Sequence, residues 1–111
     1  LASVAGTPFA TPLGDALLFL EDIDEPLYRI DRMLTQLDLS GSLTGIRAMM
    51  LGASIASPSD ADALAQIRER AGDRTVVCGL PAGHTTPNLT LPLGCPARID
   101  TESSHLVIEH P

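Results

Sequence analysis

The sequence predicts an α/β domain with a parallel βαβαβ core followed by short antiparallel strands. Three short apolar runs alternate with two segments of helical periodicity, which is typical of parallel strands joined by crossover helices. After the third run, the chain changes to short segments separated by turn-forming residues, a spacing typical of antiparallel structure. With 111 residues, 44% of them hydrophobic, the chain suits one small domain with a single modest core.

The first elements are expected to be the end of a short helix at Leu1–Ala5 and a strand at Leu17–Leu20. The strand segment, LLFL, is continuously apolar, as expected for a strand covered on both faces. Two acidic residues, Glu21 and Asp22, close its C-terminal end. Glu21 therefore lies where a buried strand reaches the surface.

A helix is predicted near Glu25–Leu39. Asp24 is expected to cap it, with Glu25 and Pro26 in the first turn. A carboxylate is favoured at the positive end of the helix dipole, and proline there loses no hydrogen bond. The apolar residues that follow recur at helical spacing and predict the buried face: Leu27, Ile30, Leu34 and Leu37.

The second strand is expected at Ile46–Leu51, the second helix at Ser59–Ala71 and the third strand at Thr75–Cys78. Ser59 and Asp62 have the spacing of a capping box, which favours a helix start at this point. The three strands are expected to be parallel neighbours in one sheet.

The loop Gly79–Asn88 is too rich in glycine and proline for regular structure. Beyond it, three short segments are candidates for two or three small strands: Leu89–Leu93, Ala97–Asp100 and His105–Glu109.

Charge and cysteine content limit the function classes. Fourteen acidic residues oppose seven basic ones, all arginine, and the net charge of -7 repels phosphate backbones and anionic lipid, so neither nucleic acid nor a membrane is an expected partner. No apolar run approaches the roughly 20 residues of a membrane span. Cys78 and Cys95 form no C-x-x-C pair, and no positively charged segment precedes an apolar region in this sequence, so we expect reduced thiols in a cytoplasmic protein.

Glu21 and His84 are the candidate functional residues. Both follow apolar strands, so they should meet at the carboxyl edge of one sheet, where ligands bind in open α/β folds. A carboxylate beside an imidazole is the part of a catalytic triad that orients the ring and stabilises its charged form. Spacing alone leaves open that they are a solvated carboxylate and a structural surface histidine.

Other residues are weaker candidates. A metal site built from Glu21, Asp22, Asp24 and His84 is possible on ligand type, but adjacent carboxylates seldom point at one ion. Ser54 follows a strand, yet its GASIA context lacks the last glycine of a nucleophile elbow. An apolar strand does not activate a thiol, which argues against Cys78. Arg29 and Arg32 are more simply solvated ion-pair residues than ligands of a substrate carboxylate. His105 and His110 need no function.

Three segments resemble the C-terminal domain of the LD-carboxypeptidases, a family that includes the microcin-immunity peptidases. They are LASVAGTP (Leu1–Pro8), FLEDIDEPLYRIDRMLTQL (Phe19–Leu37) and GLPAGHTTPNLTLPLG (Gly79–Gly94), and they occur in the family's order. The resemblance implies one domain over residues 1–111, of the swivelling β/β/α type. It also implies a serine peptidase with a Ser-Glu-His triad, in which Glu21 and His84 match the glutamate and histidine.

The same resemblance places the nucleophilic serine in an N-terminal flavodoxin-like domain, expected upstream of Leu1 and outside this sequence. It implies a murein tetrapeptide substrate, which loses its terminal D-alanine during peptidoglycan recycling, and no cofactor. The residues present do not separate this activity from cleavage of a peptidyl-nucleotide amide by the microcin-immunity peptidases. A non-catalytic module that binds a peptide or a partner is the alternative. An apolar face around His84 is expected to favour a homo-oligomer.

Overall fold

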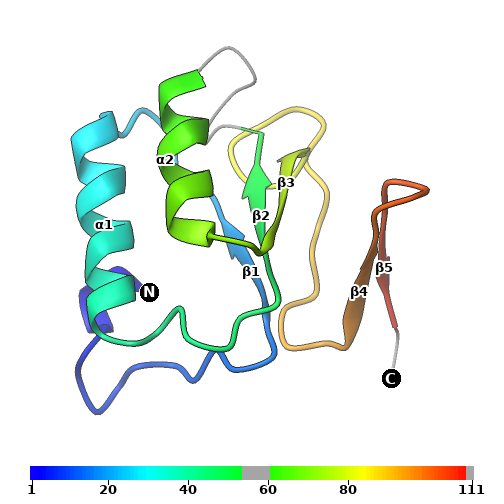
Figure 1. Cartoon of the computed structure of the whole chain (residues 1–111). Coiled ribbons are helices and arrows are strands. Elements are labelled where there is room, and N and C mark those ends of the chain that lie inside the picture. Colours follow the sequence, from blue (N-terminus) through cyan, green and yellow to red (C-terminus); the bar gives the residue numbers. More distant parts are fainter. Residues whose placement is uncertain (54–60, 110–111) are drawn as a thin grey trace.

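The computed structural model describes residues 1–53 and 61–109 (Figure 1). A parallel three-stranded sheet has the strand order β1-β2-β3, and a separate antiparallel hairpin is formed by β4 and β5. The elements are η1 (Ala2–Val4), β1 (Leu17–Leu20), α1 (Leu27–Leu39), β2 (Ala48–Gly52), α2 (Ala61–Ala71), β3 (Thr75–Leu80), β4 (Ala97–Asp100) and β5 (His105–Ile108). The predicted α/β class with a parallel βαβαβ core is confirmed.

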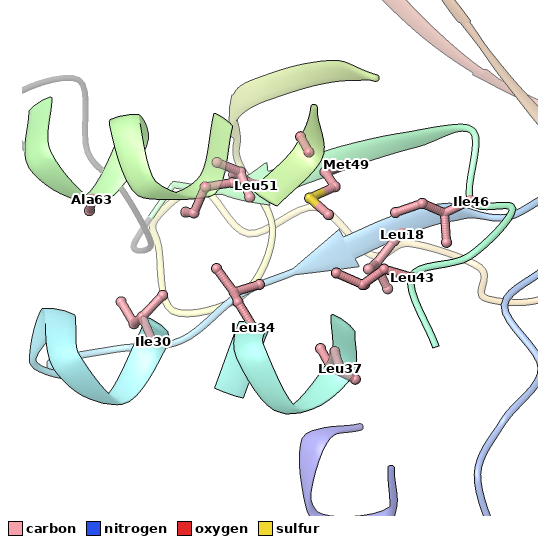
Figure 2. Close-up of a cluster of buried hydrophobic side chains, with 11 residues drawn as sticks. Leu18, Ile30, Leu34, Leu37, Leu43, Ile46, Met49, Leu51 and Ala63 are labelled. Carbon is pink, nitrogen blue, oxygen red and sulfur yellow. The ribbon is translucent and has the colours of Figure 1, made fainter. Parts of the chain in front are cut away.

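The core lies between the sheet and the two helices, which lie side by side on one of its faces (Figures 1 and 2). Side chains point alternately to opposite faces of a strand, so every second strand residue reaches the helices. The central strand β2 is buried along its whole length. The buried core comprises Leu18, Met49 and Leu51 from the strands, Ile30, Leu34 and Leu37 from α1, Ala63, Ile67 and Ala71 from α2, and Leu43 and Ile46 from the connection before β2. Burying each large side chain stabilises the fold by roughly 1.5–3 kcal/mol.

The start of α1 differs from the prediction. The helix begins at Leu27, Pro26 occupies the N-cap position in an extended conformation, and no side chain caps the end. The predicted capping by Asp24, with Glu25 and Pro26 in the first turn, is therefore wrong. Asp24 adopts a left-handed conformation with φ of +56°, whereas an N-cap residue is typically extended, as Pro26 is here.

The other boundaries are close to the predicted ones. β2 begins two residues after Ile46, and β3 continues two residues beyond Cys78. Ser59, the predicted start of the second helix, lies outside the described residues. Among the described helices, none is long and apolar enough to cross a membrane.

The segment Leu89–Leu93 does not form the strand that was one of the candidates. Its first amide donates to the carbonyl oxygen of Pro81, with an N···O distance of 2.7 Å. This hydrogen bond closes the loop after β3, so the amide is used within the loop instead of in a sheet.

Candidate active site

Glu21 and His84 meet at one edge of the parallel sheet. Glu21 directly follows β1, and His84 lies in the loop after β3, drawn in yellow in Figure 1. The His84 Nδ1 atom lies 2.9 Å from Oε2 and 3.1 Å from Oε1 of Glu21. The backbone N–H of His84 also donates to Oε1, at 3.1 Å. The predicted proximity of the two side chains is confirmed.

The two side chains of the pair differ in exposure, as expected for a histidine base that a buried carboxylate orients. The Glu21 side chain is only 11% exposed, whereas the His84 side chain is 58% exposed. A carboxylate beside Nδ1 favours the tautomer that carries its proton there, which leaves Nε2 unprotonated. An unprotonated Nε2 on an accessible ring can accept a proton from a nucleophile, and the carboxylate stabilises the imidazolium that results.

Two glycines make room for the Glu21 side chain. β2 lies between β1 and β3 and ends at Gly52. The Glu21 side chain must therefore pass over Gly52 to reach the His84 loop. A Cβ atom at Gly52 would overlap Glu21 Cγ and lie 2.9 Å from the carbonyl oxygen of Ala82. A Cβ atom at Gly83 would overlap the Glu21 carboxylate, and Gly83 has φ of +99°, a conformation that favours glycine. Both positions therefore require glycine if Glu21 is to reach His84.

Two hydrogen bonds within the His84 loop join residues near its two ends. The Gly83 N–H donates to Asn88 Oδ1 at 3.0 Å, and the Leu89 N–H donates to the Pro81 carbonyl. Gly52, Gly83 and Asn88 were not predicted from the sequence as residues of the site. A glycine at the end of an apolar run and a glycine directly before the candidate histidine were the available signals for the first two.

The sequence model of the LD-carboxypeptidase C-terminal domain matches residues 1–99. The chain belongs to this family. A Streptomyces coelicolor protein that carries the name carboxypeptidase is 38% identical over 118 aligned positions, covering 100% of this chain and 37% of the relative. A Bacillus subtilis protein that carries the name murein peptide carboxypeptidase is 34% identical, over 98% of this chain and 36% of the relative.

The fold agrees with this assignment. The crystal structure of muramoyltetrapeptide carboxypeptidase from Oxalobacter formigenes superimposes with a TM-score of 0.77 at 36% identity, over 99% of this chain and 42% of that chain. This LD-carboxypeptidase C-terminal domain thus spans little more than a third of the curated relatives that it matches. The family is a peptidase family.

The other acidic and thiol candidates do not join the Glu21–His84 pair in this LD-carboxypeptidase domain. Asp22 accepts the backbone N–H of Ile23 at 2.8 Å. Within residues 1–53 and 61–109, no three His, Cys, Asp or Glu side chains form a group that could hold a metal ion. Cys78 is half-buried against the core, and Ser54 lies outside the described residues.

The basic candidates are also accounted for by local structure. Arg29 forms an i,i+4 ion pair with Glu25 at 3.3 Å. A hydrogen bond with Tyr28 and the Glu25 charge raise the pKa of the Arg29 guanidinium above its ordinary value. Arg32 is exposed on α1, and His105 begins β5, whereas His110 lies outside the described residues. The site is therefore centred on Glu21 and His84.

Proposed function

We propose that this chain is the C-terminal domain of a serine-type LD-carboxypeptidase and supplies the histidine and the carboxylate of a Ser-Glu-His triad. The observation that carries the proposal is the hydrogen bond between His84 Nδ1 and Glu21 Oε2, with the ring accessible and the carboxylate nearly buried. The serine would belong to an N-terminal domain outside this chain. The proposal is consistent with the short coverage, 37% of the Streptomyces relative and 42% of the Oxalobacter protein.

The proposed substrate is a murein tetrapeptide, the class of compound named in the Bacillus and Oxalobacter relatives. The serine oxygen would attack the carbonyl carbon of the L,D-amide while His84 Nε2 takes its proton. The same proton would pass to the departing amine, which releases D-alanine and leaves an acyl-enzyme that water hydrolyses. Glu21 would hold the Nδ1 proton and stabilise the imidazolium in both steps. We place this reaction in cytoplasmic peptidoglycan recycling, and the free cysteines Cys78 and Cys95 are consistent with a reducing compartment.

The test is D-alanine release from a murein tetrapeptide by the complete protein that contains this chain. We expect His84→Ala to lower kcat by roughly 10³-fold or more, because nucleophile and base act as a unit. His105→Ala is the matched control, since His105 begins β5 in the hairpin, and it should leave kcat unchanged. Full activity of the His84→Ala protein would contradict the proposal.

A further inference from the structure

Asn88 contacts the backbone immediately before His84. Its Oδ1 atom accepts the Gly83 N–H at 3.0 Å. The next backbone amide, that of His84, donates to Glu21 Oε1 at 3.1 Å. Two successive amides are therefore held by two different side chains, one from within the loop and one from the end of β1.

The Asn88 side chain is presented from a fixed part of the loop. The amide of the following residue, Leu89, donates to the Pro81 carbonyl at 2.7 Å and closes the loop at that point. Asn88 is nevertheless exposed. Its side chain therefore contributes little to core packing, and its contact with Gly83 is the hydrogen bond that the structure gives it.

Gly83 needs such a hydrogen bond because it has little intrinsic preference for its own conformation. Glycine populates positive and negative φ about equally, so nothing in the residue itself keeps φ at +99°. Gly83 also packs directly against the Glu21 carboxylate. A rotation of the Gly83 backbone would therefore change this contact and move the His84 amide. The backbone conformation of Gly83, which joins the two peptide units, decides whether His84 can direct both its N–H and its Nδ1 to Glu21.

We propose that Asn88 is a positioning residue, which holds the Gly83–His84 backbone so that the imidazole keeps its Nδ1 bond to Glu21. The inference rests on the proposed function for its link to catalysis, but the geometry it describes can be measured without substrate. Asn88 would act only through Gly83 and His84 and would not touch the reacting atoms.

The experiment uses the complete protein labelled with ¹⁵N-histidine, with the His84 ring signals assigned by their loss in a His84→Gln variant. Asn88→Leu removes the acceptor at similar size, whereas Asn88→Asp keeps an oxygen in its place. Thr90→Val is the matched control in the same segment, because the Thr90 side chain is exposed. Ring ¹⁵N shifts report the tautomer, and D-alanine release gives kcat and KM.

We expect Asn88→Leu to convert the His84 signals from the Nδ1-protonated tautomer to a mixture and to lower kcat by roughly 3- to 10-fold with KM nearly unchanged. Asn88→Asp and Thr90→Val should keep the wild-type tautomer and kcat. A wild-type ring spectrum in the Asn88→Leu variant would overturn the inference. If the wild-type protein releases no D-alanine, the proposed function fails, and the ring spectra still decide the role of Asn88.

Discussion

At the scale of single residues, one carboxylate fixes both the backbone and the ring of the same histidine. Glu21 accepts the His84 N–H and lies within hydrogen-bond distance of Nδ1, so the side chain of His84 is held relative to its own main chain. Charge-assisted hydrogen bonds of this kind are stronger than neutral ones. In the proposed function, this arrangement orients the ring before the substrate binds, as in preorganised sites that lower the cost of reaching the transition state.

Gly83→Ala tests whether the space beside Glu21 is required. The added Cβ would overlap the Glu21 carboxylate and displace it, and misplacement by about 1 Å can cost on the order of 10²-fold in rate. We expect a loss of that order in kcat for D-alanine release. Gly79→Ala is the control, since Gly79 has φ of +78° but nothing within 4 Å of an added Cβ.

The two variants share the backbone strain of a side chain at positive φ, roughly 1–2 kcal/mol, so thermal unfolding should show similar destabilisation in both. Only Gly83→Ala should lose activity beyond what that destabilisation explains. Equal kcat values in the two variants would show that Glu21 does not depend on the space at Gly83.

At the scale of elements, α1 attaches to the sheet through one stripe of leucine and isoleucine side chains. Leu34 and Leu37 are each 3% exposed and Ile30 is 7% exposed, whereas Leu39 at the helix end is 84% exposed. The helix has no side-chain cap at its N-terminus. Its stability therefore depends on packing of the apolar stripe more than on its ends.

Leu34→Ala should lower the free energy of unfolding by roughly 2–5 kcal/mol, because it leaves a cavity between α1 and the sheet. Leu39→Ala makes the same chemical change in the same helix at an exposed position and should change it by less than about 0.5 kcal/mol. Urea unfolding followed by circular dichroism measures both. Similar losses would mean that the stripe does not anchor α1.

The turn between β4 and β5 makes a pH-dependent contribution to the stability of the fold. The Asp100 carboxylate accepts the Ser103 N–H at 3.1 Å and the Glu102 N–H at 3.0 Å. Hydrogen bonds from the Ser103 backbone and side chain lower the pKa of Asp100 below its ordinary value of 3.8. Since the folded pKa is the lower one, the stabilisation is complete above pH 3.8 and disappears as the pH falls through the folded pKa.

A titration followed by the side-chain ¹³C shift of Asp100 should therefore give a midpoint below 3.8. The amide signals of Glu102 and Ser103 should change with the same midpoint. In an Asp100→Asn variant, these two amide signals should lose that transition. A midpoint above 3.8 would show that the turn does not favour the carboxylate.

Much of the element order was predictable because it depends on local patterns. The parallel strands and both helices follow from apolar runs and helical periodicity. The start of α1 was not predictable, because aspartate favours helix N-caps but also tolerates the left-handed conformation that Asp24 adopts here. The candidate strand Leu89–Leu93 was wrong because its first amide bonds to Pro81, a partner that no local pattern reveals.

The candidate site was predictable to the same extent. The proximity of Glu21 and His84 follows from parallel strands whose carboxyl ends meet at one edge. The roles of Gly52 and Gly83 depend on distances of one atom between segments far apart in sequence. Asn88 contacts Gly83 through a loop conformation that spacing does not specify.

At the scale of the whole molecule, the described chain contains the hydrogen-bonded Glu21–His84 pair in a domain with a core of its own. It spans about a third of the curated relatives that it matches. Covalent catalysis needs the nucleophile in reach of the base, because each member of a triad contributes little without the others. In the proposed function, the domain therefore supplies the histidine and the glutamate of the triad, and the serine comes from another domain.

The 111-residue chain alone should accordingly release no measurable D-alanine from a murein tetrapeptide under conditions in which the complete protein is active. Circular dichroism should confirm that the isolated chain is folded before the assay. Release at a rate comparable to that of the complete protein would place the nucleophile within these residues, and the proposed division of the triad would have to be abandoned.

The bond between Glu21 and His84 also has a consequence for folding kinetics. It joins residues 63 apart in sequence and links the ends of the two outer strands across the end of the central one. Neither outer strand can reach the other until both have paired with β2, and contacts of such long sequence separation form slowly because a large loop must close first. The Glu21–His84 contact is therefore absent from every partly assembled sheet, so a newly synthesised chain forms it only when the last strand has docked.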